Sequence, residues 1–574
     1  MPALKLDGSP DVSVESRERL VRLREENPGT IRAARASFLL GLLAVEEGGA
    51  GALAYLDTAA GLKDIPDYLA FYRGRAHALE KDYKKTVSAF DSLIKDYPGS
   101  ALVPEASYLK SIALLEDGRA EEARDGMRAF VSAYPDNRLA PEALLKSAEA
   151  SVLLGQFDEA AATIRKILTD FPASLAANGA DALFREIAAG EGKAPDFTPA
   201  ERYRRGRRLF NNARFEEAAS EFSALAADPS GEFHDRAMIN SIVSKVRLKD
   251  YAGASRVLSA YLDGSRTPPK ERELDALYWS SLVSLRQGSE NGLREAVERL
   301  SAKYPLSIER ARALLFLARH YASRNMAPEA IETYKKVIDG FKGTASAEKA
   351  AWSTGWLYYR SGRFEDAFKV FSVHPASGGE LPRFLYWAGR SAENMGGIDE
   401  AARRYRLLCA AYGADYYCRM AEKRLGSLDP AFSMATASST GVTKPSVEAG
   451  KLSFEGNASS IFTDPHYLAA RELMTLGLGE RAAAEITMLM KAHSGEPGAL
   501  VELAGLFYQA EDFYSAFRVY NSYLSRLASN GAGNPFDLST LSFPPRLVEL
   551  ARRKSPPGSV DPYLIAAVIR EESA

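Results

Sequence analysis

Residues 97–135 read YPGSALVPEASYLKSIALLEDGRAEEARDGMRAFVSAYP, and this stretch decides the fold. An aromatic residue followed by proline stands at both ends, as Tyr97-Pro98 and Tyr134-Pro135, and the pair returns as Phe171-Pro172. Each copy follows the previous one after 37 residues. A constant step of this length is typical of stacked helical repeats.

A second pattern runs through more of the chain. It consists of a small residue, an alanine twelve positions later, and a large apolar residue four positions after that. In a helix–turn–helix unit the small residues allow the two helices to approach closely, and we expect the large residue to fill the gap to the next unit. The good matches are Ser111/Ala123/Met127, Ala148/Ala160/Ile164, Gly206/Ala218/Phe222, Ala318/Ala330/Tyr334, Gly355/Ala367/Phe371, Gly389/Ala401/Tyr405 and Ala504/Ala516/Tyr520, and Gly74/Thr86/Phe90 is a weaker copy.

Turn-forming pairs separate the two helices of these units. They are Asp117-Gly118, Gly155-Gln156, Asn211-Asn212, Ser361-Gly362 and Gly396-Gly397. The combination of small, alanine, aromatic and proline positions resembles the tetratricopeptide repeat, in a form longer than the usual unit of about 34 residues. The sequence therefore predicts an all-α protein built as a tetratricopeptide-like α-solenoid.

Composition excludes several classes of protein. The 574 residues are 46% hydrophobic and 26% charged, as in an ordinary globular protein. Lys and Arg total 73 and Asp and Glu total 75, so the net charge of −2 gives no reason to expect binding to nucleic acid. The basic stretches 204–208 and 552–554 are interpreted as solvated helix faces, with contact to an anionic polymer as the alternative.

Metal, cofactor and export signals are lacking in the sequence. Cys409 and Cys418 are the two cysteines, and the sequence leaves open whether they are free thiols or form a disulfide. The six histidines are scattered, so we expect no metal site, and no phosphate-binding loop predicts a cofactor. The first residues, Met-Pro-Ala-Leu-Lys-Leu-Asp-Gly, lack the apolar core of a secretory signal, and no apolar run is long enough to span a bilayer.

The last stretch, Asp561-Pro562-Tyr-Leu-Ile-Ala-Ala-Val-Ile-Arg-Glu-Glu-Ser-Ala574, is predicted to form a helix. Asp561 is a suitable N-cap, and proline suits the first helical position. The apolar run 564–569 should pack inside a domain. Glu572 falls on the apolar face, where loss of hydration would raise its pKa toward the range of a general acid. The alternative is that Glu571 and Glu572 begin the solvated end of a helix.

The order Asp-Pro-x-Leu-x-x-Ala-x-Ile-Arg-x-Glu-Ser-Ala resembles the opening of the catalytic domain of soluble lytic transglycosylases, the Slt-type enzymes. The resemblance implies that Glu572 is the catalytic acid and base. The family's next signature, Gly-Leu-Met-Gln, has no counterpart before Ala574. We therefore expect a truncated catalytic domain that is inactive alone.

Earlier motifs agree with this resemblance. Ala351-Trp-Ser-Thr-Gly-Trp-Leu-Tyr-Tyr359 is similar to the Trp-rich repeat of the family's U-shaped helical domain, and Leu385-Tyr-Trp-Ala-Gly-Arg390 with Tyr416-Tyr417 is similar to its end. Each Trp or Tyr taken singly is interpreted as a core residue rather than a sugar platform. The resemblance implies a U-shaped superhelix, a helical linker domain and the first helix of a lysozyme-like domain. The expected ranges are 1–430 for the superhelix, 431–465 for a Ser/Thr/Gly-rich linker, 466–555 for the linker domain and 556–574 for the start of the catalytic domain.

Two functions compete. The resemblance implies a periplasmic peptidoglycan lytic transglycosylase, in which one carboxyl group protonates the oxygen between MurNAc and GlcNAc. As a carboxylate it then helps the MurNAc 6-hydroxyl to attack, giving a 1,6-anhydro sugar. The partners would be glycan strands and cell-envelope proteins at the repeat surface, with no nucleic acid, no membrane span and no cofactor. The alternative is a non-catalytic tetratricopeptide scaffold, because solenoid surfaces commonly bind other proteins.

Overall fold

The computed structural model describes residues 14–48, 51–187, 197–264, 266–373, 381–411, 416–428, 461–493, 497–519 and 545–554, together with residues 522, 565 and 568. These parts of the chain are helical and contain no strand, so the predicted all-α fold is confirmed. The chain divides into two compact units, which are described separately. Unit 1 comprises residues 1–164, 179–190 and 447–574, and unit 2 comprises residues 165–178 and 191–446.

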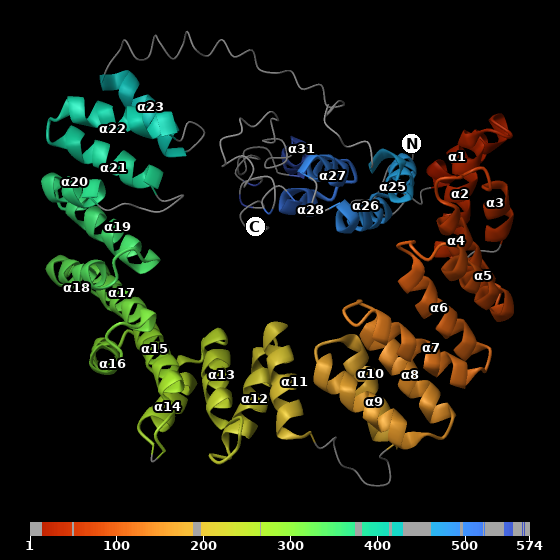
Figure 1. Cartoon of the computed structure of the whole chain (residues 1–574), viewed down its shortest axis with the longest axis horizontal. Coiled ribbons are helices and arrows are strands. Elements are labelled where there is room, and N and C mark those ends of the chain that lie inside the picture. Colours follow the sequence, from red (N-terminus) through yellow and green to blue (C-terminus); the bar gives the residue numbers. More distant parts are fainter. Residues whose placement is uncertain are drawn as a thin grey trace. The chain divides into compact units, whose positions relative to one another are not determined.

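Unit 1 combines the first repeats with helices from the last quarter of the chain (Figure 1). Two helices, α9 (Phe157–Asp170) and α10 (Leu175–Ile187), have residues in both units. The other helices of unit 1 are α1 (Val14–Glu26), α2 (Ile31–Glu46), α3 (Ala52–Thr58), α4 (Pro66–Leu79), α5 (Tyr83–Asp96), α6 (Val103–Glu116), α7 (Ala120–Ala133), α8 (Ala140–Leu153), the 3-10 helix η2 (Ile461–Thr463), α25 (Pro465–Thr475), α26 (Gly479–His493), α27 (Pro497–Gln509), α28 (Phe513–Val519) and α31 (Pro545–Lys554).

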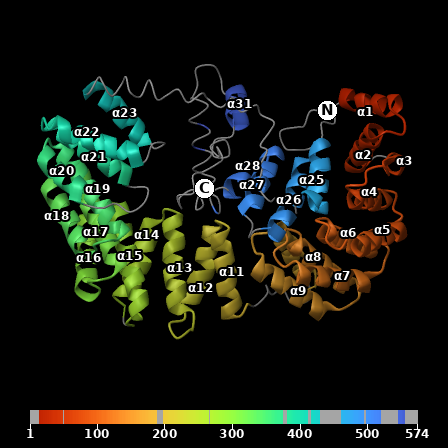
Figure 2. The same ribbon diagram turned by 45° about the horizontal axis from the view of Figure 1, so that its top comes forward.

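Unit 2 is a row of helix pairs, which can be followed in Figure 2. Each helix packs against the next one in the chain, as in a solenoid. Its helices are α11 (Pro199–Asn211), α12 (Phe215–Ala226), α13 (His234–Arg247), α14 (Tyr251–Leu262), α15 (Lys270–Gln287), α16 (Glu290–Lys303), α17 (Ile308–Ser323), α18 (Ala327–Gly340), α19 (Ala345–Arg360), α20 (Phe364–Val373), α21 (Leu381–Asn394), α22 (Ile398–Ala411) and α23 (Tyr416–Leu428).

Turns between paired helices follow the predicted signals with one difference. Gly118 and Gly362 adopt φ values of +79° and +72°, a left-handed conformation that favours glycine. At the predicted Asn211-Asn212 turn, the left-handed residue is instead Ala213, with φ of +59°. The sequence signal therefore found this turn but not the residue that bears the unusual backbone conformation.

The small-to-large pattern describes contacts within a helix pair. A Cβ atom added to Gly355 would lie 2.5 Å from the ring of Phe371, and one added to Gly389 would lie 2.5 Å from the ring of Tyr405. The large residue thus covers the small residue of its own pair. It also reaches the next unit as expected, since the ring of Phe371 lies 5.8 Å from that of Phe384 on α21.

This contact predicts opposite effects for two glycine substitutions. Gly355→Ala should lower the free energy of unfolding by about 1–3 kcal/mol, because the added methyl group overlaps Phe371. Gly340→Ala on α18 is the matched control, since its added Cβ would meet no atom closer than 4.0 Å. It should be neutral or raise stability by up to about 1 kcal/mol. Chemical denaturation measures both, and a Gly355→Ala protein as stable as Gly340→Ala would contradict the contact.

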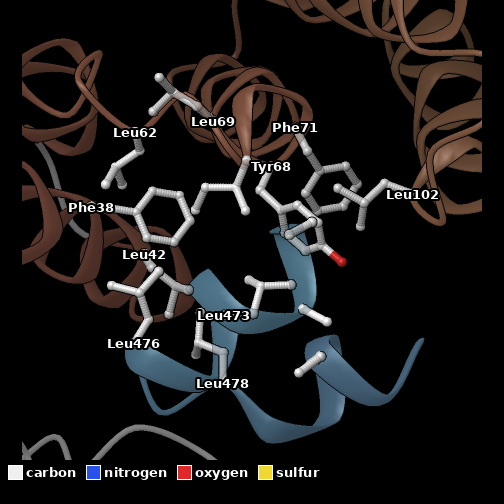
Figure 3. Close-up of a cluster of buried hydrophobic side chains, with 14 of the residues drawn as sticks. Phe38, Leu42, Leu62, Tyr68, Leu69, Phe71, Leu102, Leu473, Leu476 and Leu478 are labelled. Carbon is white, nitrogen blue, oxygen red and sulfur yellow. The ribbon is translucent and has the colours of Figure 1, made fainter. Parts of the chain in front are cut away.

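One hydrophobic core in unit 1 joins residues far apart in the chain. Figure 3 shows Phe38, Tyr68 and Phe71 of the first repeats beside Leu473 and Leu478 of the last quarter. All five side chains are at most 6% exposed. The residues 461–519 that contribute to this core are called the returning segment below. The domain boundaries at 430, 465 and 555 stay predictions, and residues 431–460 of the predicted linker lie outside the described residues.

Candidate functional site

Glu572, the predicted catalytic acid, lies outside the described residues. Two residues of the apolar run that precedes it are described, Ile565 and Val568, and both are helical. The side chain of Val568 is 54% exposed, so at this position the run is not packed inside a domain as the sequence suggested. The raised pKa of Glu572 stays a prediction.

The returning segment is attached to the first repeats by ion pairs at the edge of the shared core. Arg35 of α2 donates from Nε and Nη2 to the two carboxylate oxygens of Glu472 on α25, at 2.7 and 2.5 Å. Arg481 of α26 donates to Glu105 of α6 at 2.8 Å. A two-pronged guanidinium–carboxylate contact fixes orientation as well as charge. These pairs therefore set how the returning segment lies against α2 and α6.

A buried carboxylate lies deeper in the same contact. The Tyr68 hydroxyl of α4 donates to Oε1 of Glu485 at 2.7 Å, and His466 Nδ1 lies 2.6 Å from Oε2. Glu485 is 1% exposed, and both of its oxygens are engaged. Burial, and then the charge of Glu485, raise the pKa of Tyr68 well above its usual value, so the hydroxyl stays a donor. The arrangement suits a structural link better than proton transfer to a substrate.

The link predicts a pH dependence of stability. The hydrogen bond to Glu485 raises the pKa of His466, and the charges of Glu485, Asp464 and Asp67 act in the same direction. A pKa raised on folding stabilises the folded state below the unfolded value of about 6.5, and this contribution is lost as the pH rises through the folded pKa. Because His466 is partly exposed, water screens the pair, and the contribution should stay below about 1 kcal/mol.

Thermal unfolding of the wild type and of His466→Gln measures this effect. The melting temperature of the wild type should fall more between pH of about 6 and about 8 than that of the variant. Parallel profiles for the two proteins would contradict the role of His466. Burial raises the pKa of Asp67, but this group is present in both proteins, so the difference between their profiles reports on His466.

Aromatic residues of the two motifs 351–359 and 385–390 lie together on the first helices of two successive pairs. Trp352, Trp356 and Tyr359 follow one another along α19 with nearly parallel rings, 6.2 and 5.9 Å between centroids. Trp387 of α21 lies edge-on to Trp356 at 4.8 Å and to Tyr359 at 4.9 Å. The four side chains, called the aromatic cluster below, are half-buried. They pack on the core of unit 2 and also reach its surface.

The two cysteines are joined in the structure. Cys409 of α22 and Cys418 of α23 form a disulfide with a Cα–Cα distance of 4.8 Å. Glu422 lies close enough to the two sulfur atoms to complete a group of three possible metal ligands. With both sulfurs in the disulfide, no thiolate is available to bind a metal. The structure thus decides between the two states that the sequence left open.

The sequence reasoning missed the buried link between Tyr68 and Glu485. The two residues are separated by 417 positions and stand on the separate helices α4 and α26. No local pattern marks such a pair. The one available signal is a carboxylate on the helix stripe that also carries Ala482, Ile486 and Leu489, all buried.

Comparison with known proteins confirms the repeat. The tetratricopeptide repeat family matches residues 68–100, 87–138 and 108–174. These residues therefore carry tetratricopeptide repeats. No curated protein sequence matches the chain.

Several solved structures are similar to the chain. The 70 kDa soluble lytic transglycosylase Slt70 from Escherichia coli shares 16% identity over 95% of this chain and 85% of its own, with a TM-score of 0.47. The lytic transglycosylase Slt from Pseudomonas aeruginosa shares 15% identity over 89% of this chain and 73% of its own, with a TM-score of 0.42. A tetratricopeptide repeat protein from Parabacteroides merdae shares 15% identity over 50% of this chain and 98% of its own, with a TM-score of 0.25. With identities of 15–16% and TM-scores below 0.5, these similarities carry no argument about function, which is therefore argued from the residues of this chain.

Proposed function

We propose that the chain is the helical scaffold of a peptidoglycan lytic transglycosylase, with Glu572 as the catalytic acid and base. The observation that carries the proposal is the ordered motif from Asp561 to Ala574, which resembles the opening of that catalytic domain. The aromatic cluster supports it, because tryptophans from two separate motifs of the same resemblance, Trp356 and Trp387, are in contact.

The chemistry needs one carboxyl group. In its acid form Glu572 would give its proton to the glycosidic oxygen between MurNAc and GlcNAc. As a carboxylate it would then take the proton of the MurNAc 6-hydroxyl while that oxygen bonds to the anomeric carbon. The proton balance closes without water, which distinguishes the reaction from hydrolysis by two carboxylates. A dry cleft is required, because proton transfer depends on hydrogen-bond contact with the leaving oxygen.

The location follows from the substrate. Peptidoglycan lies outside the cytoplasmic membrane, so the proposal places the protein in the periplasm. The disulfide between Cys409 and Cys418 supports this, since disulfides persist in oxidising compartments. In the described ranges, no helix is both long and apolar enough to cross a membrane.

The second candidate is a non-catalytic tetratricopeptide scaffold that binds proteins of the cell envelope. The match of residues 68–174 to the tetratricopeptide family favours it, because such repeats often serve as binding surfaces.

Digestion of purified sacculi tests the two candidates. The protein as its gene encodes it, whatever follows residue 574, should release muropeptides that end in 1,6-anhydro-MurNAc, and these are identified by mass spectrometry. A protein that binds sacculi but releases nothing would favour the scaffold.

A further inference from the structure

Charge is unevenly divided between the two helices of each pair in unit 2. The first helices, α11, α13, α15, α17, α19, α21 and α23, carry 21 Lys and Arg against 9 Asp and Glu. The second helices, α12, α14, α16, α18, α20 and α22, carry 10 against 13. The near-neutral net charge of the whole chain conceals this division, which concentrates positive charge on one layer of unit 2.

The first helices also contact one another. Helix α15 packs against both α13 and α17, and α17 packs against α19. Rings cross these contacts, since Phe316 of α17 lies 5.9 Å from Tyr278 of α15, and the guanidinium of Arg312 lies 5.9 Å from the centre of the Tyr278 ring. Charged and aromatic side chains from successive first helices therefore share one surface.

Basic side chains recur at equivalent positions on three successive first helices. Arg312, Lys349 and Arg383 each stand six residues before the small residue of the repeat pattern. Arg319 and Arg390 each stand one residue after it, where α19 has Trp356. The five basic side chains, Arg312, Arg319, Lys349, Arg383 and Arg390, are called the basic row below. Helical spacing places Phe316 between Arg312 and Arg319, and Trp387 between Arg383 and Arg390.

Part of the basic row is available to a ligand. Arg312, Arg319 and Lys349 are exposed and form no ion pair with any residue that the structure describes. Arg390 of the row lies 3.6 Å from Glu393, which is also paired with Arg424 and accepts from the Tyr405 hydroxyl. Three charges of the row, those of Arg312, Arg319 and Lys349, are thus left without an ion-pair partner among the described residues.

We propose that the face of α17, α19 and α21 that carries the basic row and the aromatic cluster binds a strand of carboxylate-bearing glycan. The choice of peptidoglycan as the source of that strand rests on the proposed function. Guanidinium groups bind carboxylates through paired hydrogen bonds. A partly exposed ring such as that of Trp356 offers apolar surface to the faces of sugar units. The face would hold the strand at a distance from the reacting bond.

Two other anionic ligands fit the observations less well. The disulfide indicates an oxidising compartment, where nucleic acid is not the usual partner. An acidic peptide would use the basic row, but it would leave the aromatic cluster without a role.

Co-sedimentation with purified sacculi tests the proposal with paired charge reversals. Arg312→Glu combined with Arg319→Glu changes the face, and Arg256→Glu combined with Lys335→Glu is the matched control on α14 and α18, where both residues are exposed. At low salt the first variant should bind about tenfold or more weakly than wild type, because each basic group near an anionic surface contributes on the order of 1 kcal/mol. Equal losses in both variants, or no loss in either, would overturn the proposal.

Further comparisons identify the ligand chemistry. Sacculi whose carboxylates have been converted to amides should bind several-fold more weakly. Glycan strands freed of their peptides should still bind, since cleavage of the amide bond leaves a free lactyl carboxylate on each MurNAc; loss of binding would assign the face to the peptides and overturn the glycan assignment. A labelled single-stranded oligonucleotide that binds more tightly than sacculi would also overturn it.

Aromatic substitutions separate ring contacts from charge. Trp356→Ala should weaken binding at high salt, and Trp356→Phe should restore most of it while both proteins retain the wild-type circular dichroism spectrum. Trp356→Ala that folds and binds like wild type would remove the aromatic cluster from the proposal. A Glu572→Gln protein should bind sacculi normally, so failure of the catalytic proposal and failure of this one give different results.

Discussion

Replacing Glu572 by glutamine is expected to reduce the release of 1,6-anhydromuropeptides at least about a hundredfold, because general acid–base catalysis contributes on this scale. Glutamine has nearly the same shape but can neither donate the proton to the glycosidic oxygen nor accept one from the 6-hydroxyl. The measurement compares initial rates of muropeptide release by the wild-type and variant proteins, as their genes encode them, at equal amounts of bound protein.

Glu571→Gln is the matched control for this prediction. It removes an equal charge one position away, on another side of the predicted helix. It should change the rate by less than about tenfold, since a displaced surface charge acts weakly through solvent. Full activity of Glu572→Gln, or an equal loss from both variants, would show that the chemistry lies elsewhere.

Leu473→Ala in the returning segment is expected to lower the free energy of unfolding of unit 1 by about 3 kcal/mol. Leu473 is 0% exposed within the core shared with Phe38 and Tyr68, so truncation leaves a cavity in addition to the lost burial. Leu468→Ala on the same helix is the control, because its side chain is 38% exposed and should cost less than about 1 kcal/mol.

Denaturant unfolding followed by fluorescence and by limited proteolysis would measure this difference. In the Leu473→Ala protein, cleavage within residues 461–519 should become faster than in Leu468→Ala, since the returning segment depends on the shared core. Two variants of equal stability would contradict the packing of the returning segment against the first repeats.

Local spacing was sufficient to predict the helix pairs. The interval of sixteen residues from Gly355 to Phe371 and from Gly389 to Tyr405 brings each small residue under the ring of its partner, because both lie within one helix–turn–helix unit. The large residue also reaches the next unit as predicted, since the ring of Phe371 lies 5.8 Å from that of Phe384. The crossing angle of the helices, on which both contacts depend, is not encoded by spacing.

Long-range contacts could not be predicted from spacing. The core between the first repeats and the returning segment joins Phe38 to Leu473, and each residue alone fits any amphipathic helix. The buried link from Tyr68 to Glu485 is similar, since the sequence gives no sign that two distant polar residues satisfy each other. The sequence left the disulfide open because two cysteines nine positions apart suit either state. Its formation depends on where α22 ends and where α23 begins, since these ends bring Cys409 close to Cys418.

The candidate site was predicted in part. The motif order led to Glu572, which the described residues do not include, and to tryptophans that the structure brings into the aromatic cluster. Taken singly, each ring was interpreted as a core residue. This interpretation is only partly correct, because Trp387 packs against the core of unit 2 and is also partly exposed to solvent. The basic row became visible only when the helices could be sorted into first and second members of each pair.

Digestion of sacculi in water labelled with heavy oxygen tests the central proposal most directly. A lytic transglycosylase closes the new bond with the MurNAc 6-hydroxyl, so the released ends should contain no heavy oxygen and should be anhydro sugars. A hydrolase takes its oxygen from water. Released muropeptides with labelled reducing ends would contradict the proposed function.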